Sequence, residues 1–167
     1  METMTAQPLV LGPGEGEAVD FGGLGARFMA VGEGFSLVEH VIAPRTLAAP
    51  LHVHEHEDEY SYVLEGEVGV QVAGEVRYAR AGDLVAKPRG IWHAFWNRAD
   101  EPARLLEIVS PGGFERYFAD IAPLLPPQRP EPDFEGLGQV MARYGLRMDM
   151  DSIATICERE GLPLPPA

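Results

Sequence analysis

Apolar and polar residues alternate in short runs through the middle of the chain, which is the pattern of half-buried strands. The expected strands cover residues 35–42, 60–64, 68–72, 76–79, 84–86, 92–96 and 104–109. Turn-forming pairs such as Glu65-Gly66 and Ala73-Gly74 separate them. Short strands at such close spacing predict an all-β sandwich or barrel.

After Val109 the apolar residues recur with the spacing of helices instead. Three groups each share one helical face: Phe114, Tyr117, Phe118 and Ile121; Leu137, Val140, Met141 and Tyr144; and Ile153, Ile156 and Cys157. Gly145 is expected to end the second helix, and Asp151 or Ser152 to begin the third. The sequence therefore predicts C-terminal amphipathic helices that pack on the barrel.

The pattern divides the chain into three parts. Residues 7–34 are rich in glycine with short apolar islands, and they predict short, irregular outer strands. We expect residues 1–34 to extend the barrel, residues 35–110 to form its core and residues 111–167 to form the helical tail. A chain of 167 residues suits one such domain.

Composition narrows the choice of partners and compartment. Thirteen basic residues against twenty-six acidic ones give a formal net charge of −13, which disfavours nucleic acid and anionic membranes as partners. No apolar run approaches the ~20 residues that cross a bilayer. Cys157 is the only cysteine, so no internal disulfide is expected. These features favour a cytoplasmic protein.

Four of the five histidines gather in two places, residues 52–56 and His93. Side chains two apart on a strand point to the same face, so His52 and His54 can present their imidazoles side by side to one interior. Glu59, at the start of the next strand, can add a carboxylate oxygen. Imidazole with carboxylate suits a divalent ion of iron, manganese, nickel, cobalt, copper or zinc, and the residues leave the choice among them open.

The spacing of these residues resembles the two motifs of the cupin family. The first motif, G-x5-H-x-H-x4-E-x6-G, is matched by His52, His54, Glu59 and Gly66, with Thr46 in place of the opening glycine. The second, G-x5-P-x-G-x2-H-x3-N, is matched by Gly82, Pro88, Gly90, His93 and Asn97. The resemblance implies a double-stranded β-helix, or jelly-roll-like, barrel. It also implies one divalent metal ion held by His52, His54, Glu59 and His93.

Two histidines stand outside that motif. His56 repeats the His-x-His spacing, but its distance to Glu59 does not fit, so we place it on the surface turn or at the barrel mouth. His40 is interpreted as a strand histidine near or outside the site.

Strand alternation also predicts the wall of a substrate pocket. If His93 faces inward, Ile91 and Phe95 do too, and if Glu59 does, Ser61 and Val63 follow. This wall would be mostly apolar with one aromatic ring, which suits a planar or hydrophobic organic substrate.

A finer resemblance concerns activity. The runs 52–67 and 101–115 are similar to single-domain cupins described as quercetin dioxygenase-like. This favours a metal-dependent dioxygenase of a phenolic or enolic small molecule, with Glu59 as general base. Two alternatives stay open: a cupin that binds a metal and a small ligand without turnover, and a redox-neutral isomerase or hydrolase. Small cupins of this kind resemble dimers formed through the barrel face or an exchanged N-terminal strand, so a homodimer is expected.

Overall fold

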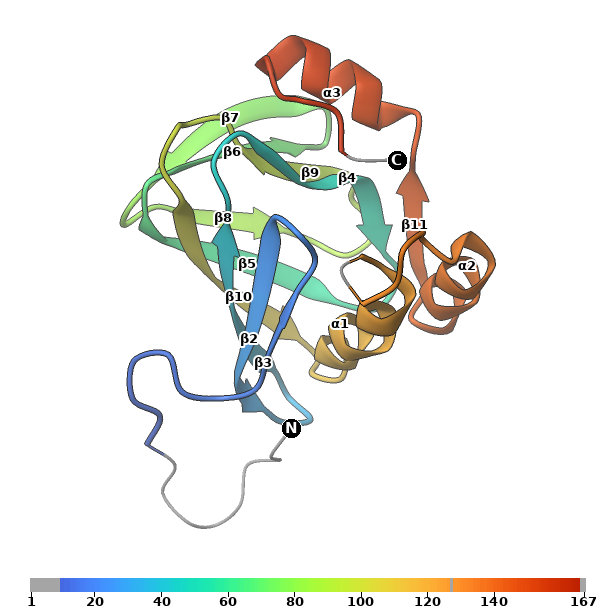
Figure 1. Ribbon diagram of the computed structural model, residues 1–167. Coiled ribbons are helices and arrows are strands. Elements are labelled where there is room, and N and C mark those ends of the chain that lie inside the picture. The colour runs from blue at the N-terminus through green and yellow to red at the C-terminus, as the bar shows by residue number, and fades with distance from the viewer. Residues whose placement is uncertain (1–9, 127, 166–167) are drawn as a thin grey trace.

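A computed structural model of the chain describes residues 10–126 and 128–165, so residues 7–9 of the predicted N-terminal strands lie outside it. Two antiparallel sheets face each other (Figure 1). The first sheet has the order β1 (Ala18–Asp20), β2 (Leu24–Val31), β3 (Ser36–Ile42), β10 (Ala103–Ser110), β5 (Asp58–Glu65) and β8 (Leu84–Lys87). The second has the order β11 (Leu146–Asp149), β4 (Thr46–His54), β9 (His93–Asn97), β6 (Glu67–Val72) and β7 (Glu75–Arg80). The predicted all-β barrel is confirmed.

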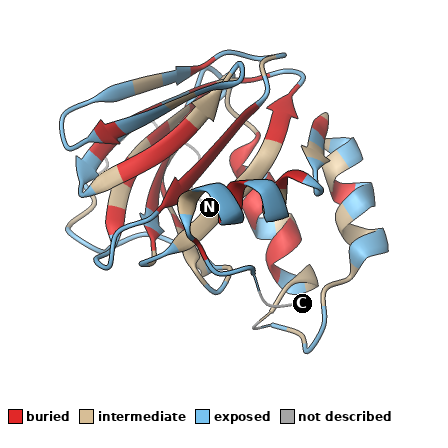
Figure 2. Cartoon of the chain, turned by 90° about the horizontal axis from the view of Figure 1, so that it is seen from above, coloured by how far each residue is buried: buried red, intermediate tan, exposed pale blue. Residues whose placement is uncertain are grey.

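Strand alternation builds the interior. Along β10 every second residue is buried, and Ala103, Leu105, Glu107 and Val109 face inward. Along β5 the inward residues are Glu59, Ser61 and Val63. Buried residues gather where the two sheets face each other and on the helix sides that turn toward them (Figure 2). Because the alternation is strict, a polar side chain on an inward position is held inside the barrel.

The helical tail covers two regions of the barrel. Helix α1 (Glu115–Ile121), the 3-10 turn η1 (Ala122–Leu124) and α2 (Phe134–Arg143) follow β10, and their apolar faces share one core cluster with Phe28, Val38 and Val109. Helix α3 (Ser152–Glu160) packs on the second sheet, where Ile156 and Cys157 meet Trp96. The predicted C-terminal amphipathic helices are therefore confirmed. No helix among the described residues is long and apolar enough to span a bilayer.

Three strands differ from the sequence prediction. β4 lies outside the predicted strand runs, although His52 and His54 were expected to lie on a strand. β2 is longer than the short strands expected, with eight residues, because β3 pairs with it along its length, and this pairing has one register shift between Phe28 and Ala30. β11 lies outside all predicted runs, since four residues between two helices are too few to show a period. It pairs with β4, placing Met148 opposite His52 and Leu146 opposite His54. The missed strand thus supports the strand that carries two histidines of the motif.

Candidate metal centre

The structure brings four predicted site residues together inside the barrel. His52 and His54 lie at the end of β4, Glu59 at the start of β5 and His93 at the start of β9. Each offers one ligand atom, these atoms lie within 4.8 Å of one another, and all four side chains are buried. His52 and His93 are register partners across the β4–β9 ladder, which explains how residues 41 positions apart meet.

Backbone carbonyl groups fix the orientation of two of the imidazole rings. Nδ1 of His52 lies 2.8 Å from the carbonyl oxygen of Pro50, and Nδ1 of His93 lies 2.9 Å from that of Ile91. Because a carbonyl oxygen only accepts, we place the proton on Nδ1 in both rings. This tautomer leaves a lone pair on each Nε2, as a metal ligand requires.

His54 tests whether the cluster suits a metal. Its ring is buried, and neither ring nitrogen has a hydrogen-bond partner among the described residues. The nearest carboxylate oxygens are Oε1 of Glu59, 3.4 Å from Nε2, and Oε2 of Glu57, 3.7 Å from Nδ1. A buried imidazole without partners is costly, and a bound cation would give this ring a partner. The donor set therefore fits a divalent cation.

The charge states of His52, His93 and Glu59 are those of metal ligands. Burial, together with the neighbouring imidazoles, lowers the pKa of His52 well below its ordinary value, and burial also lowers the pKa of His93. Burial opposes ionisation of Glu59, but His54, Lys87 and His93 outweigh it and hold the pKa of that carboxyl well below its usual range. Neutral imidazoles and an ionised carboxylate are the forms that bind a metal.

A second group of polar side chains lies beside the four and escaped the sequence reasoning. Nζ of Lys87 lies 3.1 Å from Oε2 of Glu59 and 2.8 Å from Oε2 of Glu107. Ser61 donates a 2.9 Å hydrogen bond to the same Glu107 oxygen. Burial, aided by the charge of Glu59 and opposed by Lys87, raises the pKa of Glu107 to about 7. Strand alternation was the available signal, because Lys87 follows the inward Val85 and Glu107 lies between Leu105 and Val109.

The residues predicted to line the substrate pocket take different positions. Ser61, Val63 and Phe95 are buried inside the barrel, whereas Ile91 is half-buried and precedes β9. Val63 and Phe95 belong to one apolar core cluster. The Ser61 hydroxyl is engaged by Glu107. The interior beside Glu59 is thus more polar than the sequence prediction of a mostly apolar wall.

The two remaining histidines lie apart from the cluster. His56 is exposed in the turn between β4 and β5. His40 is buried on β3, its Nδ1 lies 3.0 Å from the carbonyl oxygen of Gly25, and its ring packs edge-on against Phe118 at 5.2 Å. Neither residue belongs to the group whose ligand atoms converge.

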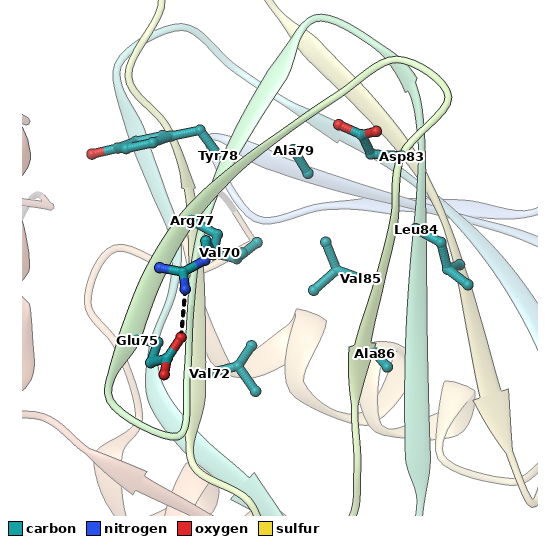
Figure 3. A pocket seen from close by; sticks show the side chains of 10 residues that line it. All are labelled: Val70, Val72, Glu75, Arg77, Tyr78, Ala79, Asp83, Leu84, Val85 and Ala86. Atoms are coloured by element: carbon teal, nitrogen blue, oxygen red, sulfur yellow. Dashed lines mark hydrogen bonds and ion pairs between the residues drawn. The ribbon is translucent and has the colours of Figure 1, made fainter.

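An aromatic ring covers the cluster on the His54 side, and a hollow in the surface lies toward β7 and β8. The Phe114 ring, next to α1, meets the His54 ring edge-on at 4.3 Å and covers it. Between the unpaired edges of β7 and β8 there is instead a hollow of about 400 Å³, shown in Figure 3. Its lining residues include Val70, Val72, Arg77, Ala79, Leu84 and Val85. None of the four candidate ligands lines this β7–β8 hollow, but Val72 pairs with His93 and Val85 pairs with Ser61.

Comparison with known proteins bears on family and fold. A family model described as "Cupin domain" matches residues 38–109. A 60-residue stretch is 37% identical to "Polyketide synthase CurC" of Streptomyces cyaneus, covering 36% of this chain and 39% of that protein. The "Tetracenomycin polyketide synthase protein TcmJ" of Streptomyces glaucescens is 35% identical over 60 residues, covering 36% of this chain and 40% of that protein. The matched stretch spans about two fifths of the length of these curated relatives.

Among solved structures, an RmlC-like cupin from Shewanella frigidimarina NCIMB 400 superposes with a TM-score of 0.55 at 25% sequence identity. The superposition covers 64% of this chain and 93% of that one. The residues matched by the family model, 38–109, include all four converging residues.

Proposed function

Because this chain belongs to the cupin superfamily, we propose that it holds one divalent metal ion on His52, His54, Glu59 and His93 and acts on a phenolic or enolic small molecule with dioxygen. The observation that carries the proposal is the convergence of four buried ligand atoms within 4.8 Å. The partnerless ring of His54 supports it, since that ring gains a partner when a cation binds.

The charge of the site favours a substrate of a particular kind. When bound, a divalent ion supplies Lewis-acid stabilisation of negative charge on a substrate oxygen. With three neutral imidazoles and the Glu59 carboxylate, the ligand set leaves a net charge of +1 on the loaded site. An organic monoanion, such as a phenolate or enolate, neutralises that charge.

Glu59 is the proposed general base. Its Oε2 is held by the Lys87 ammonium group, so we assign proton acceptance to Oε1, which would have to leave the cation to act as base. Its pKa is held well below the usual range, which makes the carboxylate a weak base. A weak base removes protons only from acidic hydroxyl groups. Phenols and enols carry such hydroxyls and simple alcohols do not, which supports the proposed substrate class.

The β7–β8 hollow supplies a place for the apolar body of the substrate. Val70, Val72 and Val85 give it apolar walls, and Arg77 stands at its rim, paired with Glu75 at 2.7 Å (Figure 3). Its lining strands β6 and β8 pair with β9 and β5, the strands that carry His93 and Glu59, whereas β4 with His52 and His54 lies one strand further away. Since Phe114 covers the His54 side, we propose that substrate approaches from the β7–β8 side.

A redox-neutral reaction on the same kind of substrate is the second candidate. Two relatives are described as polyketide synthase proteins. Polyketides carry ketone groups that form enols and phenols, and their conversion need not involve dioxygen. The same four ligands and the same base would serve such an isomerisation or hydrolysis.

Oxygen uptake separates the two reactions. Protein loaded in turn with Fe²⁺, Mn²⁺ or Ni²⁺ is mixed with a flavonol or a 1,3-diketone in an oxygen electrode, with metal-free protein and Glu59→Gln as controls. We expect uptake above both controls with at least one metal. Loss of the substrate absorbance without uptake would replace the dioxygenase by the redox-neutral enzyme. Binding without any turnover would indicate a metal- and ligand-binding protein.

We also propose that a second copy of the chain covers the outer face of the first sheet. Tyr60, Tyr62 and Leu64 of β5 alternate outward and are exposed. Leu84 and Leu106 are the register partners of Tyr62 on its two sides. A row of apolar side chains on a sheet face is typical of an interface between protein chains.

A further inference from the structure

The only lysine of the chain lies inside the barrel. The side chain of Lys87 is 1% exposed. The other twelve residues among the lysines and arginines of the chain are all arginines. Its Nζ lies 2.8 Å from Glu107 and 3.1 Å from Glu59, and 5.0 Å from the centre of the Phe95 ring. Both carboxylates lie within hydrogen-bonding distance of Nζ and stabilise its positive charge, so the side chain is an ammonium ion.

A buried ammonium ion costs more free energy than an apolar side chain that would fill the same space. Removing an ammonium ion from water costs several kcal/mol, and well-packed apolar residues often replace buried ion pairs without loss of stability. The arrangement is also specific: Ser61 and Lys87 share one oxygen of Glu107, and Lys87 then reaches Glu59. The chain of contacts ends on a candidate metal ligand, which indicates a role in the site.

The contacts of Glu59 show what that role is. Its Oε2 is the oxygen that faces both Lys87 Nζ and His93 Nε2, each at 3.1 Å. Its Oε1 faces His54 Nε2 at 3.4 Å. A carboxylate with one oxygen held by an ammonium group cannot turn freely, and binding of a cation through that oxygen competes with the ammonium contact.

We propose that Lys87 is a positioning residue that holds Oε2 of Glu59 and thereby keeps this carboxylate a one-oxygen ligand, with Glu107 as its counter-ion. The inference rests on the proposed metal-binding function. Lys87 also competes with the cation for Glu59 and repels it, so it weakens metal binding while it fixes the coordination.

Cobalt(II) tests the proposal, because its visible absorption reports the number and arrangement of ligands. Wild type, Lys87→Met and Lys87→Arg are titrated with Co²⁺ without oxygen, and the affinity is measured by competition with a chelating dye. We expect Lys87→Met to bind Co²⁺ at least tenfold more tightly and with weaker visible bands, as both oxygens of Glu59 become free to coordinate. Lys87→Arg keeps the positive charge, and we expect it to restore the wild-type bands.

A double variant separates positioning from charge. Lys87→Met with Glu107→Gln removes one charge of each sign, so no counter-ion is left unpaired in the barrel. We expect the changed cobalt spectrum to persist, while the gain in affinity becomes smaller than in Lys87→Met alone. Circular dichroism shows whether each variant folds. If Lys87→Met alone does not fold, the cobalt spectrum of the double variant is the test.

Three outcomes would overturn the inference. Variants with the wild-type spectrum and an affinity within twofold of wild type would make Lys87 a purely structural residue. Lys87 variants with the wild-type spectrum but a raised Co²⁺ affinity would show that the charge of Lys87 repels the cation without positioning Glu59. Wild-type protein that binds no Co²⁺ would overturn the proposed metal-binding function as well, so the two failures are distinguishable.

Discussion

At the scale of single residues, His40 couples the folded barrel to pH. Burial lowers its pKa from 6.5 to about 4. As the pH falls from 6.5 toward 4, His40 is therefore protonated in the unfolded chain but stays neutral in the folded one. Stability from this residue is complete above pH 6.5 and is lost across that interval, by about 3 kcal/mol for a shift of this size.

The measurement is urea unfolding of metal-free protein, with a chelator present, at pH 7.5 and at pH 4.0. His40→Gln is the matched variant, because its amide can still donate to the Gly25 carbonyl. We expect wild type to lose about 2 to 3 kcal/mol more than this variant between the two pH values. Parallel losses would show that His40 takes up its proton in the folded protein as readily as in the unfolded one.

Residue-level reasoning from the sequence reached the four converging residues but not their neighbours. His52, His54, Glu59 and His93 were predictable because alternation and motif spacing both point them inward. Lys87 and Glu107 were missed although strand alternation places both on inward positions, because a charged residue on a strand is ordinarily expected to face water. The Lys87 ammonium is stabilised by residues 28 positions before it and 20 after it, a contact that no local pattern records.

At the scale of elements, the close approach of β6 and β9 depends on one glycine. A Cβ on Gly69 would lie 2.1 Å from Nε1 of Trp96, and the Trp96 ring is fully buried under α3. We expect Gly69→Ala to destabilise the protein by about 1 to 3 kcal/mol, because the ring cannot move without disturbing that packing. Since β9 carries His93, metal affinity should fall with it.

Gly138→Ala is the control for that substitution. Gly138 lies within α2 and has open space where a Cβ would be. Alanine there should stabilise the protein by about 0.5 to 1 kcal/mol through its helix propensity. Urea unfolding of both variants gives the comparison, and equal effects of the two substitutions would refute the packing argument.

The elements themselves were largely predictable, and the exceptions have a physical cause. Strands such as β5 and β10 alternate strictly between buried and exposed residues, so their period is visible. β11 is four residues long and gains its stability from the edge of β4, which is nearly a hundred positions away in sequence. Long-range pairing of this kind leaves no periodic signature.

At the scale of the whole molecule, the exposed face of the first sheet predicts self-association. Tyr62 is 41% exposed and Leu84 is 60% exposed, at neighbouring register positions. We expect the protein to sediment as a dimer. Tyr62→Arg should shift it toward the monomer by placing a charge in the apolar row.

Phe134→Arg serves as the matched control, because Phe134 is equally apolar and 71% exposed but lies on α2, away from this face. It should leave the dimer intact. Sedimentation equilibrium measures both variants. A monomeric wild type, or a Tyr62→Arg protein as dimeric as wild type, would place the interface elsewhere or remove it.

The central claim is that three imidazoles and one carboxylate bind a cation together, and the metal content of the purified protein tests it most directly. Elemental analysis is made on wild type, His93→Ala and His56→Ala after incubation with a divalent transition metal and removal of the excess. The account predicts about one metal ion per chain in wild type and in His56→Ala, and loss of most of it in His93→Ala. Wild type without metal, or His93→Ala with as much metal as wild type, would contradict it.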